Sequence, residues 1–140
     1  ACDRPLRAAI ALARQVHGAL APPGGTFVAL VPLMASAGGA GDTARASLGE
    51  GVRLLTKSLA KTWGADGITA HSITLDPHAF LAAADADGIA SDNALHDPPL
   101  GRVPDDTVDV APIVDWLASD TAAPLVGSSL VIDGGLWMPG

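Results

Sequence analysis

The chain has 140 residues, of which 49% are apolar and 16% charged, and its formal net charge is −7. This composition excludes a disordered chain, and the negative charge argues against binding to nucleic acid or to an anionic membrane, since both need a basic surface. No apolar run approaches the ~20 residues of a membrane span, and the start lacks a signal-peptide pattern. The single cysteine, Cys2, excludes an internal disulfide and favours a cytoplasmic location. The chain begins with Ala, so we expect a processed start or a piece of a longer chain.

The first forty residues predict a helix, a strand and a loop. Asp3 is a candidate cap for the helix, whose apolar positions recur with a helical period: Leu6, Ala9, Ile10, Ala13, Val16 and Leu20. A Pro- and Gly-rich turn ends this helix. Residues 26–31 are apolar on both faces and rich in strand-forming residues, as in a buried parallel strand, and the small residues of 35–41 predict a loop.

A second helix is predicted from a cap at Asp42 to about Trp63, with Gly64 in the left-handed conformation that commonly follows a helix. Residues 68–73 predict the second strand. The helix has an apolar stripe formed by Leu48, Val52, Leu55 and Leu59, and an outward face that carries Glu50, Arg53, Lys57 and Lys61.

The remaining sequence predicts a long irregular segment, a third helix and a third strand. Residues 75–104 are rich in proline and aspartate, with a short helical piece expected at 79–86, and a loop of that length is usually functional or disordered. Thr107 or Asp109 is expected to cap the third helix. Residues 130–132 form the third strand, so helices and short apolar strands alternate and predict an α/β fold with one parallel sheet.

Several stretches resemble the short-chain dehydrogenases/reductases. After their catalytic Tyr-x-x-x-Lys motif, these proteins have a helix and strand that resemble VRLLTKSLAKTWGADGITAHSI (52–73). Their C-terminal signature is similar to GRVPDDTVDVAPIVDWLASDTAAPLVGSSLVIDGG (101–135), and their preceding helix and strand resemble the first helix with GGTFVALVP. The resemblance implies that residues 1–140 form the C-terminal half of a Rossmann-like domain: an α/β fold with a partial parallel sheet of three strands flanked by helices.

The resemblance implies an NAD(P)-dependent oxidoreductase in which Tyr transfers a proton, Lys lowers its pKa and Ser orients the substrate carbonyl. Alignment on Leu-Thr-Lys-Ser-Leu-Ala places Arg45 at the Tyr position, Gly49 at the Lys position and Pro32 or a neighbour at the Ser position, with Ser36 the nearest hydroxyl. The sequence contains no tyrosine, and Asn93, its only asparagine, lies far from the first helix, where the family has its relay Asn. Arg45 stays protonated and Gly49 carries no charge, so we expect no catalytic residue in this chain.

The residues that bind the cofactor in the family also differ in this chain. The family's G-x-G phosphate loop is absent, and the one substitute, the Gly-Gly-Ala-Gly of 38–41, has the wrong spacing and is followed by the negative charge of Asp42. Where members show an Asn and a Pro-Gly that packs on nicotinamide, this chain has His71 and then residues 75–78. We therefore expect no cofactor for the chain alone, and NAD(P) only if a partner completes the fold.

Other candidate groups are weak. Asp76-Pro77-His78 and His96-Asp97-Pro98 could be metal ligands or acid–base pairs, but Asp and His are common in turns and no spaced His or Cys motif supports a metal. Ser47 lacks a nucleophile-elbow motif. Cys2 is interpreted as incidental. Trp116 and Trp137 are large apolar residues that we expect in the core or at an interface.

An interface is favoured over an active site. In the resembling family, the first two helices here form a bundle between subunits, and the last strand with its Asp-Gly-Gly tail forms a second contact. The residues that we expect at these interfaces are Leu6, Ile10, Val16, Leu48, Val52, Leu55, Leu59, Asp133, Gly134 and Trp137. A sheet of three strands would also leave an edge open to a partner.

These observations favour a catalytically degenerate subunit with a structural or oligomerisation role, pairing with itself or with an active relative. The rival hypothesis is an NAD(P)-dependent oxidoreductase whose cofactor-binding half is supplied elsewhere. A third, a small-ligand binding module that uses residues 75–104, has no specific motif.

Overall fold

The computed structural model describes residues 3–21, 23–93, 95 and 97–138. Cys2 and His96, both considered above, lie outside the described residues. The elements in chain order are α1 (Asp3–Leu20), β1 (Gly25–Pro32), α2 (Met34–Ala37), α3 (Thr43–Trp63), β2 (Ile68–Leu75), α4 (Ala83–Asp92), α5 (Ala111–Leu117) and β3 (Ser129–Ile132). Short 3₁₀ turns follow α3, β2 and α5, and a π turn, Asp106–Val110, leads into α5.

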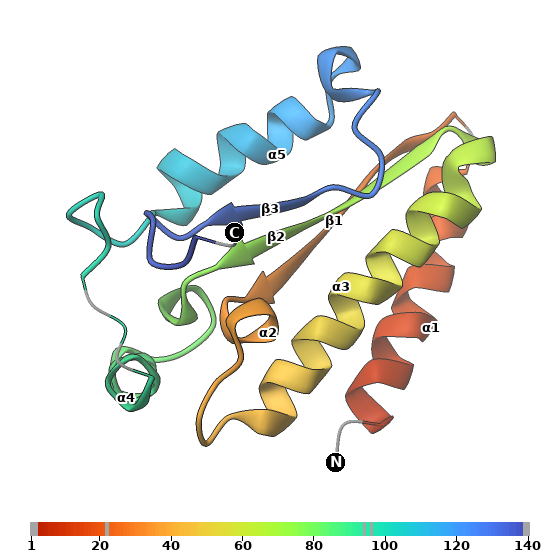
Figure 1. Ribbon diagram of the computed structural model, residues 1–140. Helices are drawn as coiled ribbons and strands as arrows, with labels where there is room; N and C mark the ends of the chain where they lie inside the picture. Colours follow the sequence, from red (N-terminus) through yellow and green to blue (C-terminus); the bar gives the residue numbers. More distant parts are fainter. Residues whose placement is uncertain (1–2, 22, 94, 96, 139–140) are drawn as a thin grey trace.

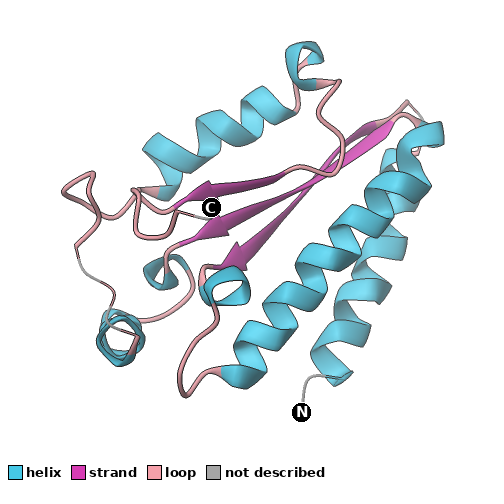
Figure 2. Ribbon diagram, viewed as in Figure 1, coloured by secondary structure: helices cyan, strands magenta, loops and turns pink. Residues whose placement is uncertain are grey.

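The strands form one parallel sheet of three strands in the order β1-β2-β3 (Figures 1 and 2). α1 and α3 lie on one side of this sheet and α5 on the other (Figure 1). β1 pairs with β2 along its whole length, from Gly25 opposite Ile68 to Pro32 opposite Leu75. The sequence-based prediction of a parallel α/β sheet is therefore confirmed, and all three predicted strands are present.

The sheet separates two apolar clusters, because side chains of successive strand residues point to opposite faces. On the α5 side, Ile73 and Leu75 pack with Val110 and Leu117. On the other side, Trp63 at the end of α3 packs with Ala13 and Ile68, with the ring of Phe27 edge-on at 5.8 Å. No helix in the described part of the chain is long and apolar enough to cross a membrane.

Two segments predicted as irregular contain helices. α2 overlaps the loop predicted at 35–41, and the helical piece predicted at 79–86 is instead α4 at 83–92. The small residues of 35–41 carry little periodic signal, and α2 is only four residues long. α4 is rich in alanine, which favours a helix without forming an apolar stripe.

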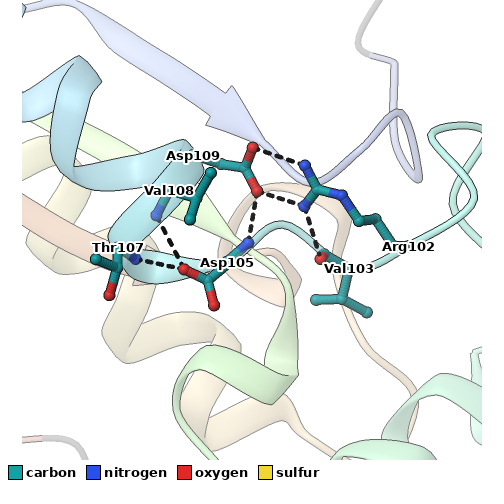
Figure 3. A network of polar contacts seen from close by, with 6 residues as sticks. All are labelled: Arg102, Val103, Asp105, Thr107, Val108 and Asp109. Carbon is teal, nitrogen blue, oxygen red and sulfur yellow. Dashed lines mark hydrogen bonds and ion pairs between the residues drawn. The ribbon is translucent and has the colours of Figure 1, made fainter.

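The structure corrects the predicted helix ends. Asp3 is itself the first residue of α1, and its carboxylate pairs with Arg7. Gly64 is right-handed, with φ −57°, and continues into a 3₁₀ turn, so the left-handed residue is Gly67, with φ 72°. Asp105, rather than Thr107 or Asp109, caps the turn before α5 by accepting hydrogen bonds from two backbone amides (Figure 3).

The buried side of α3 is displaced from the predicted stripe. The predicted residues Leu48, Val52, Leu55 and Leu59 are half-buried. The fully buried positions are their helical neighbours, namely Gly49, Thr56, Ala60 and Trp63. Small residues let α3 approach the sheet closely, and Trp63 then fills the space at the end of the helix.

Truncation of Trp63 tests this arrangement. We expect Trp63→Ala to lower the free energy of unfolding by about 3–5 kcal/mol, because it leaves a cavity between α1, α3 and the sheet. Trp116→Ala is the matched control, since Trp116 is exposed on α5 and its loss leaves no cavity. Urea denaturation followed by circular dichroism measures both, and equal effects of the two substitutions would contradict the assignment of Trp63 to the core.

Candidate functional site

The structure brings together the positions where the resemblance places the catalytic groups. Pro32 ends β1, while Arg45 and Gly49 lie in the first turns of α3, and all three line one cavity of about 200 Å³. Its other lining residues are apolar: Leu30, Val31, Leu48, Val52 and Phe80. The cavity therefore lies where the resemblance places an active site, and among its lining residues Arg45 alone has a polar side chain.

Gly49 brings α3 into close contact with α2 and β1. A Cβ atom added to Gly49 would lie 2.7 Å from Cβ of Ala35 and 3.2 Å from Cδ of Pro32. Real Cβ atoms do not approach other atoms this closely, so any side chain here requires α3 to move away from α2 and β1. A lysine at this position does not fit the present packing.

Arg45 is held by a neighbouring carboxylate. Its Nε lies 3.2 Å from Oδ1 of Asp42, and its side chain is partly exposed. Asp42 precedes α3 as predicted, but its side chain accepts no hydrogen bond from the helix amides, and its Oδ2 is buried without a hydrogen-bond partner in the described part of the chain. The Asp42 carboxylate therefore faces Arg45 instead of capping the helix.

The glycine-rich segment before α3 is closed by contacts within the chain. The backbone N–H of Ala40 donates to Oδ1 of Asn93 at 2.6 Å, and that of Asp42 donates to the carbonyl of Gly39. Asn93, which lies far from the first helix where the family has its relay Asn, thus connects the end of α4 to this segment. The Ala40 amide is used here and does not point at free space for an anion.

A chain of polar contacts follows β2. Asp76 is buried, and its Oδ1 accepts hydrogen bonds from the backbone N–H of His78 at 2.8 Å and from the ring Nδ1 at 2.5 Å. The other ring nitrogen, Nε2, lies 3.0 Å from Oδ1 of Asp87 on α4. The hydrogen bonds to Asp76 and then to Asp87 raise the pKa of His78 above its ordinary value.

Sequence reasoning considered Asp76-Pro77-His78 but missed Asp87, because the helix that carries it was placed too early. The Asp-x-His spacing, in which an aspartate accepts from the amide two residues on, was the available signal. No group of three or more His, Cys, Asp or Glu residues that could hold a metal ion occurs among the residues described.

His71 lies in the middle of β2, where the resemblance places the family's Asn. The side chain is fully buried, and neither ring nitrogen has a hydrogen-bond partner in the described structure. Removal from water lowers its pKa, so the ring is held neutral inside the apolar layer.

Glu50 and Arg53, predicted to face outward, instead border a second cavity. The guanidinium of Arg53 donates from Nε and Nη2 to the two oxygens of Glu50, and Nη1 lies 3.5 Å from Oγ of Ser129 on β3. These hydrogen bonds lower the pKa of Glu50 and raise that of Arg53. The cavity, of about 460 Å³, is also lined by Ala35, Ser36, Thr74, Val131 and Trp137.

A third cavity, of about 580 Å³, lies beside β3 and α5 and includes the predicted interface residues Asp133, Gly134 and Trp137. The Asp133 carboxylate accepts hydrogen bonds from the backbone N–H groups of Gly135 and Trp137, so it shapes the turn after β3. At its rim, Arg102 pairs with Asp109 through both carboxylate oxygens and holds the pKa of Asp109 at about 2 (Figure 3).

Comparisons with known proteins identify the family to which the chain belongs. Residues 1–137 match the family model described as enoyl-(acyl carrier protein) reductase. The L-rhamnose 1-dehydrogenase (NAD(P)(+)) of Sphingomonas sp. (strain SKA58) is 34% identical over 137 residues, which cover 94% of this chain and 50% of that protein. The chain belongs to the short-chain dehydrogenase/reductase family.

A solved structure agrees with this assignment. The crystal structure of a proposed short-chain alcohol dehydrogenase from Sinorhizobium meliloti 1021 superimposes with a TM-score of 0.68 at 26% identity, over 83% of this chain and 47% of that one. The chain thus spans about half the length of these short-chain dehydrogenase/reductase relatives.

Substitution of Gly49 tests the close contact in that cavity. We expect Gly49→Ala to destabilise the protein by about 1–3 kcal/mol, because its Cβ overpacks against Ala35 and Pro32. Gly88→Ala is the control: Gly88 lies inside α4 with nothing within 4 Å of an added Cβ, so alanine there stabilises by about 0.5–1 kcal/mol. Denaturant unfolding measures both, and a stabilising Gly49→Ala would show that the helix is not in close contact.

The polar chain at His78 predicts a pH dependence. Because the folded-state pKa of His78 is raised, its contribution to stability is complete below the unfolded-state pKa of about 6.5 and is lost as the pH rises through the folded-state pKa. We expect His78→Gln to lower stability at about pH 5.5 and to have less effect at about pH 8.5. Asp87→Asn should reduce the same dependence in part. Urea midpoints across pH measure it, and an unchanged profile in His78→Gln would contradict the assignment.

Proposed function

We propose that this chain is a catalytically degenerate member of the short-chain dehydrogenase/reductase family with a structural, oligomer-forming role, pairing with itself or with an active relative. The observation that supports the proposal is the cavity lined by Pro32, Arg45 and Gly49. The resemblance places the catalytic Tyr at Arg45, the Lys at Gly49 and the Ser at Pro32 or a neighbour. The side chains of Pro32, Arg45 and Gly49 neither give nor take a proton at a working pH. The sequence has no tyrosine that could act instead.

The proposal extends to the cofactor. Gly49 offers neither the charge nor the space of the family's lysine, and the Ala40 amide, in the only glycine-rich segment before a helix, is bound to Asn93. We therefore propose that the chain alone binds no dinucleotide, and that NAD(P) enters only if another chain completes the site.

The proposed helical interface is supported by leucine side chains of α1 and α3 that remain exposed. The predicted residues of both helices are half-buried, and a Cβ on Gly51 would lie 3.5 Å from Leu6, so α1 and α3 pack closely on each other. Two leucines on these helices remain exposed, Leu12 and Leu54, with exposed fractions of 58% and 59%. Exposed leucines on both helices of a packed pair suit further helix packing between subunits.

The second candidate is an oxidoreductase that becomes complete with another chain. It is favoured by the sheet, in which β1 has a partner on one edge only, and by the dehydrogenase activity in the name of the Sphingomonas relative. Such an enzyme would have to take its catalytic tyrosine from the other chain, since this one has none.

Dinucleotide titration separates the two candidates. We expect no saturable change in the fluorescence of the three tryptophans on addition of NADH or NADPH to the chain. The Sphingomonas dehydrogenase, titrated under the same conditions, is the positive control. Saturable quenching in this chain, followed by hydride transfer, would overturn the proposal.

Light scattering tests the structural role. We expect an oligomer in solution, and Leu54→Lys should shift it toward the monomer, because a charge then enters the helix interface. Val126→Lys, at an exposed turn residue, should leave the oligomer intact. A monomer that also captures no partner would contradict the structural role.

A further inference from the structure

A cavity on the α3 side of the sheet has no part in the proposed function. It has a volume of about 460 Å³ and lies between α3, α2 and the strands β2 and β3, beside Glu50 and Arg53. None of its lining residues borders the cavity at Pro32, Arg45 and Gly49. This Glu50–Arg53 cavity is therefore separate from the positions where the resemblance places the catalytic groups.

The guanidinium of Arg53 is held in one orientation and keeps a donor for a further partner. Its Nε and Nη2 donate to the two carboxylate oxygens of Glu50 at 2.6 and 2.5 Å. Among the described residues, Nη1 contacts only Oγ of Ser129, at 3.5 Å, which is the long limit of a hydrogen bond. A molecule in the cavity can therefore accept from Nη1 at little entropic cost, because the ion pair has already fixed the side chain.

Buried hydroxyl groups add to the polar lining. Thr74 is only 1% exposed, it lines the cavity, and its hydroxyl makes no hydrogen bond in the part of the chain that the structure describes. Oγ of Ser129 accepts from the hydroxyl of Ser72 at 2.9 Å, which leaves the O–H group of Ser129 to donate to another acceptor. A buried hydroxyl is stabilised when it is hydrogen-bonded, so these groups favour a polar ligand.

An aromatic side chain completes the lining. Trp137 is half-buried at the cavity, and its backbone N–H donates to Oδ2 of the buried Asp133 at 2.8 Å, so the turn that carries it is fixed. An indole ring presents a flat apolar face, against which the C–H groups of a ring-shaped ligand can pack. The cavity therefore suits a molecule that has both an apolar face and several polar groups.

The charges around the cavity determine the class of ligand. Arg53 repels a cation, whereas Glu50 and the net charge of −7 repel an anion. A hydroxyl group suits both members of the pair, since it accepts from the guanidinium and donates to the carboxylate. The volume of about 460 Å³ lies within the ~300–1,000 Å³ of small-molecule sites. The expected ligand is therefore small, neutral and rich in hydroxyl groups.

We propose that the Glu50–Arg53 cavity binds a neutral polyhydroxylated molecule of about the size of a monosaccharide. One hydroxyl of the ligand accepts from Nη1 of Arg53, another donates to Glu50, and a third bonds to the hydroxyl of Thr74. The apolar face of the ligand packs on Trp137. This inference goes beyond the structural role proposed above and does not depend on it.

Tryptophan fluorescence tests the site with three neutral probes: D-glucose, D-mannose and myo-inositol. We expect a saturable change with at least one of them, with a Kd below about 10 mM. D-gluconate and protonated D-glucosamine, which match glucose in size but carry a charge, should bind at least about tenfold more weakly. Trp137→Phe should abolish the response, while Trp116→Phe, at an exposed position on α5, should retain it.

Two substitutions in the cavity lining test its polar groups. Arg53→Met keeps a long side chain and removes the donors, so we expect the affinity for the neutral probe to fall by about tenfold. Thr74→Val keeps the shape and removes the hydroxyl, and should lower the affinity by about fivefold. Lys61→Met is the matched control, since it removes the same charge from α3 at an exposed residue outside the lining. Circular dichroism shows whether each variant is folded, and saturation-transfer NMR measures binding without the tryptophan signal.

Removal of the negative charge gives an opposite prediction. Glu50→Gln leaves Arg53 as the one charged residue that lines the cavity. We expect D-gluconate to bind this variant at least about tenfold more tightly than it binds the unaltered chain, because its carboxylate then pairs with the guanidinium. A substitution that merely damaged the structure would instead weaken the binding of glucose and gluconate alike.

The outcomes separate this inference from the proposed function. The absence of saturable binding of any neutral probe to the folded chain overturns the inference, and so does gluconate or glucosamine binding more tightly than all three. Equal affinities in Arg53→Met, Thr74→Val and Lys61→Met would show that the probe binds elsewhere, which overturns it too. None of these results alters the outcome of the dinucleotide titration or the oligomer expected in solution.

Discussion

The double pairing of β2 is the constraint on which the rest of the structure depends. Among the strands of the described residues, β2 alone has neighbours on both edges, and most of its residues are buried. Its two faces separate the Trp63 cluster from the cluster beneath α5, so α1, α3 and α5 are all positioned through it. Even His71, a polar side chain with no partner in the described structure, is retained at its centre. Loss of this pairing would separate the two apolar layers and remove the surface on which the helices rest.

The candidate site is formed by close packing of α3 on the end of β1. The first turns of α3 lie there, and Gly49 contacts Ala35 and Pro32. The small residue allows the helix to approach the strand. The polar groups nearby, Asp42 with Arg45 and Asp76 with His78, hold neighbouring segments in place.

The predictable part of the fold is the part with periodic apolar residues. Residues 26–31 and 68–73 were found as strands because their apolar runs are continuous, and α1 and α3 because their stripes repeat every helical turn. α4 and the cap at Asp105 were misplaced, because alanine-rich and aspartate-rich segments offer several equivalent positions. The Glu50–Arg53 pair was predicted to face outward, since the sequence does not reveal that β3 begins beside it. Asp87 was missed because its contact with His78 depends on where α4 lies.

The parallel connections have a consequence for the order in which the chain folds. Paired residues such as Thr26 and Thr69 are 43 positions apart, and Ser72 and Ser129 are 57 apart. Helices form within microseconds from local contacts, whereas pairings of this separation wait for long loops to close. During synthesis β1 therefore leaves the ribosome well before β2 and much before β3, and it spends that interval without its partner β2. A nascent strand of this composition depends on early contacts with α1 and α3, or on a chaperone, to stay out of aggregates.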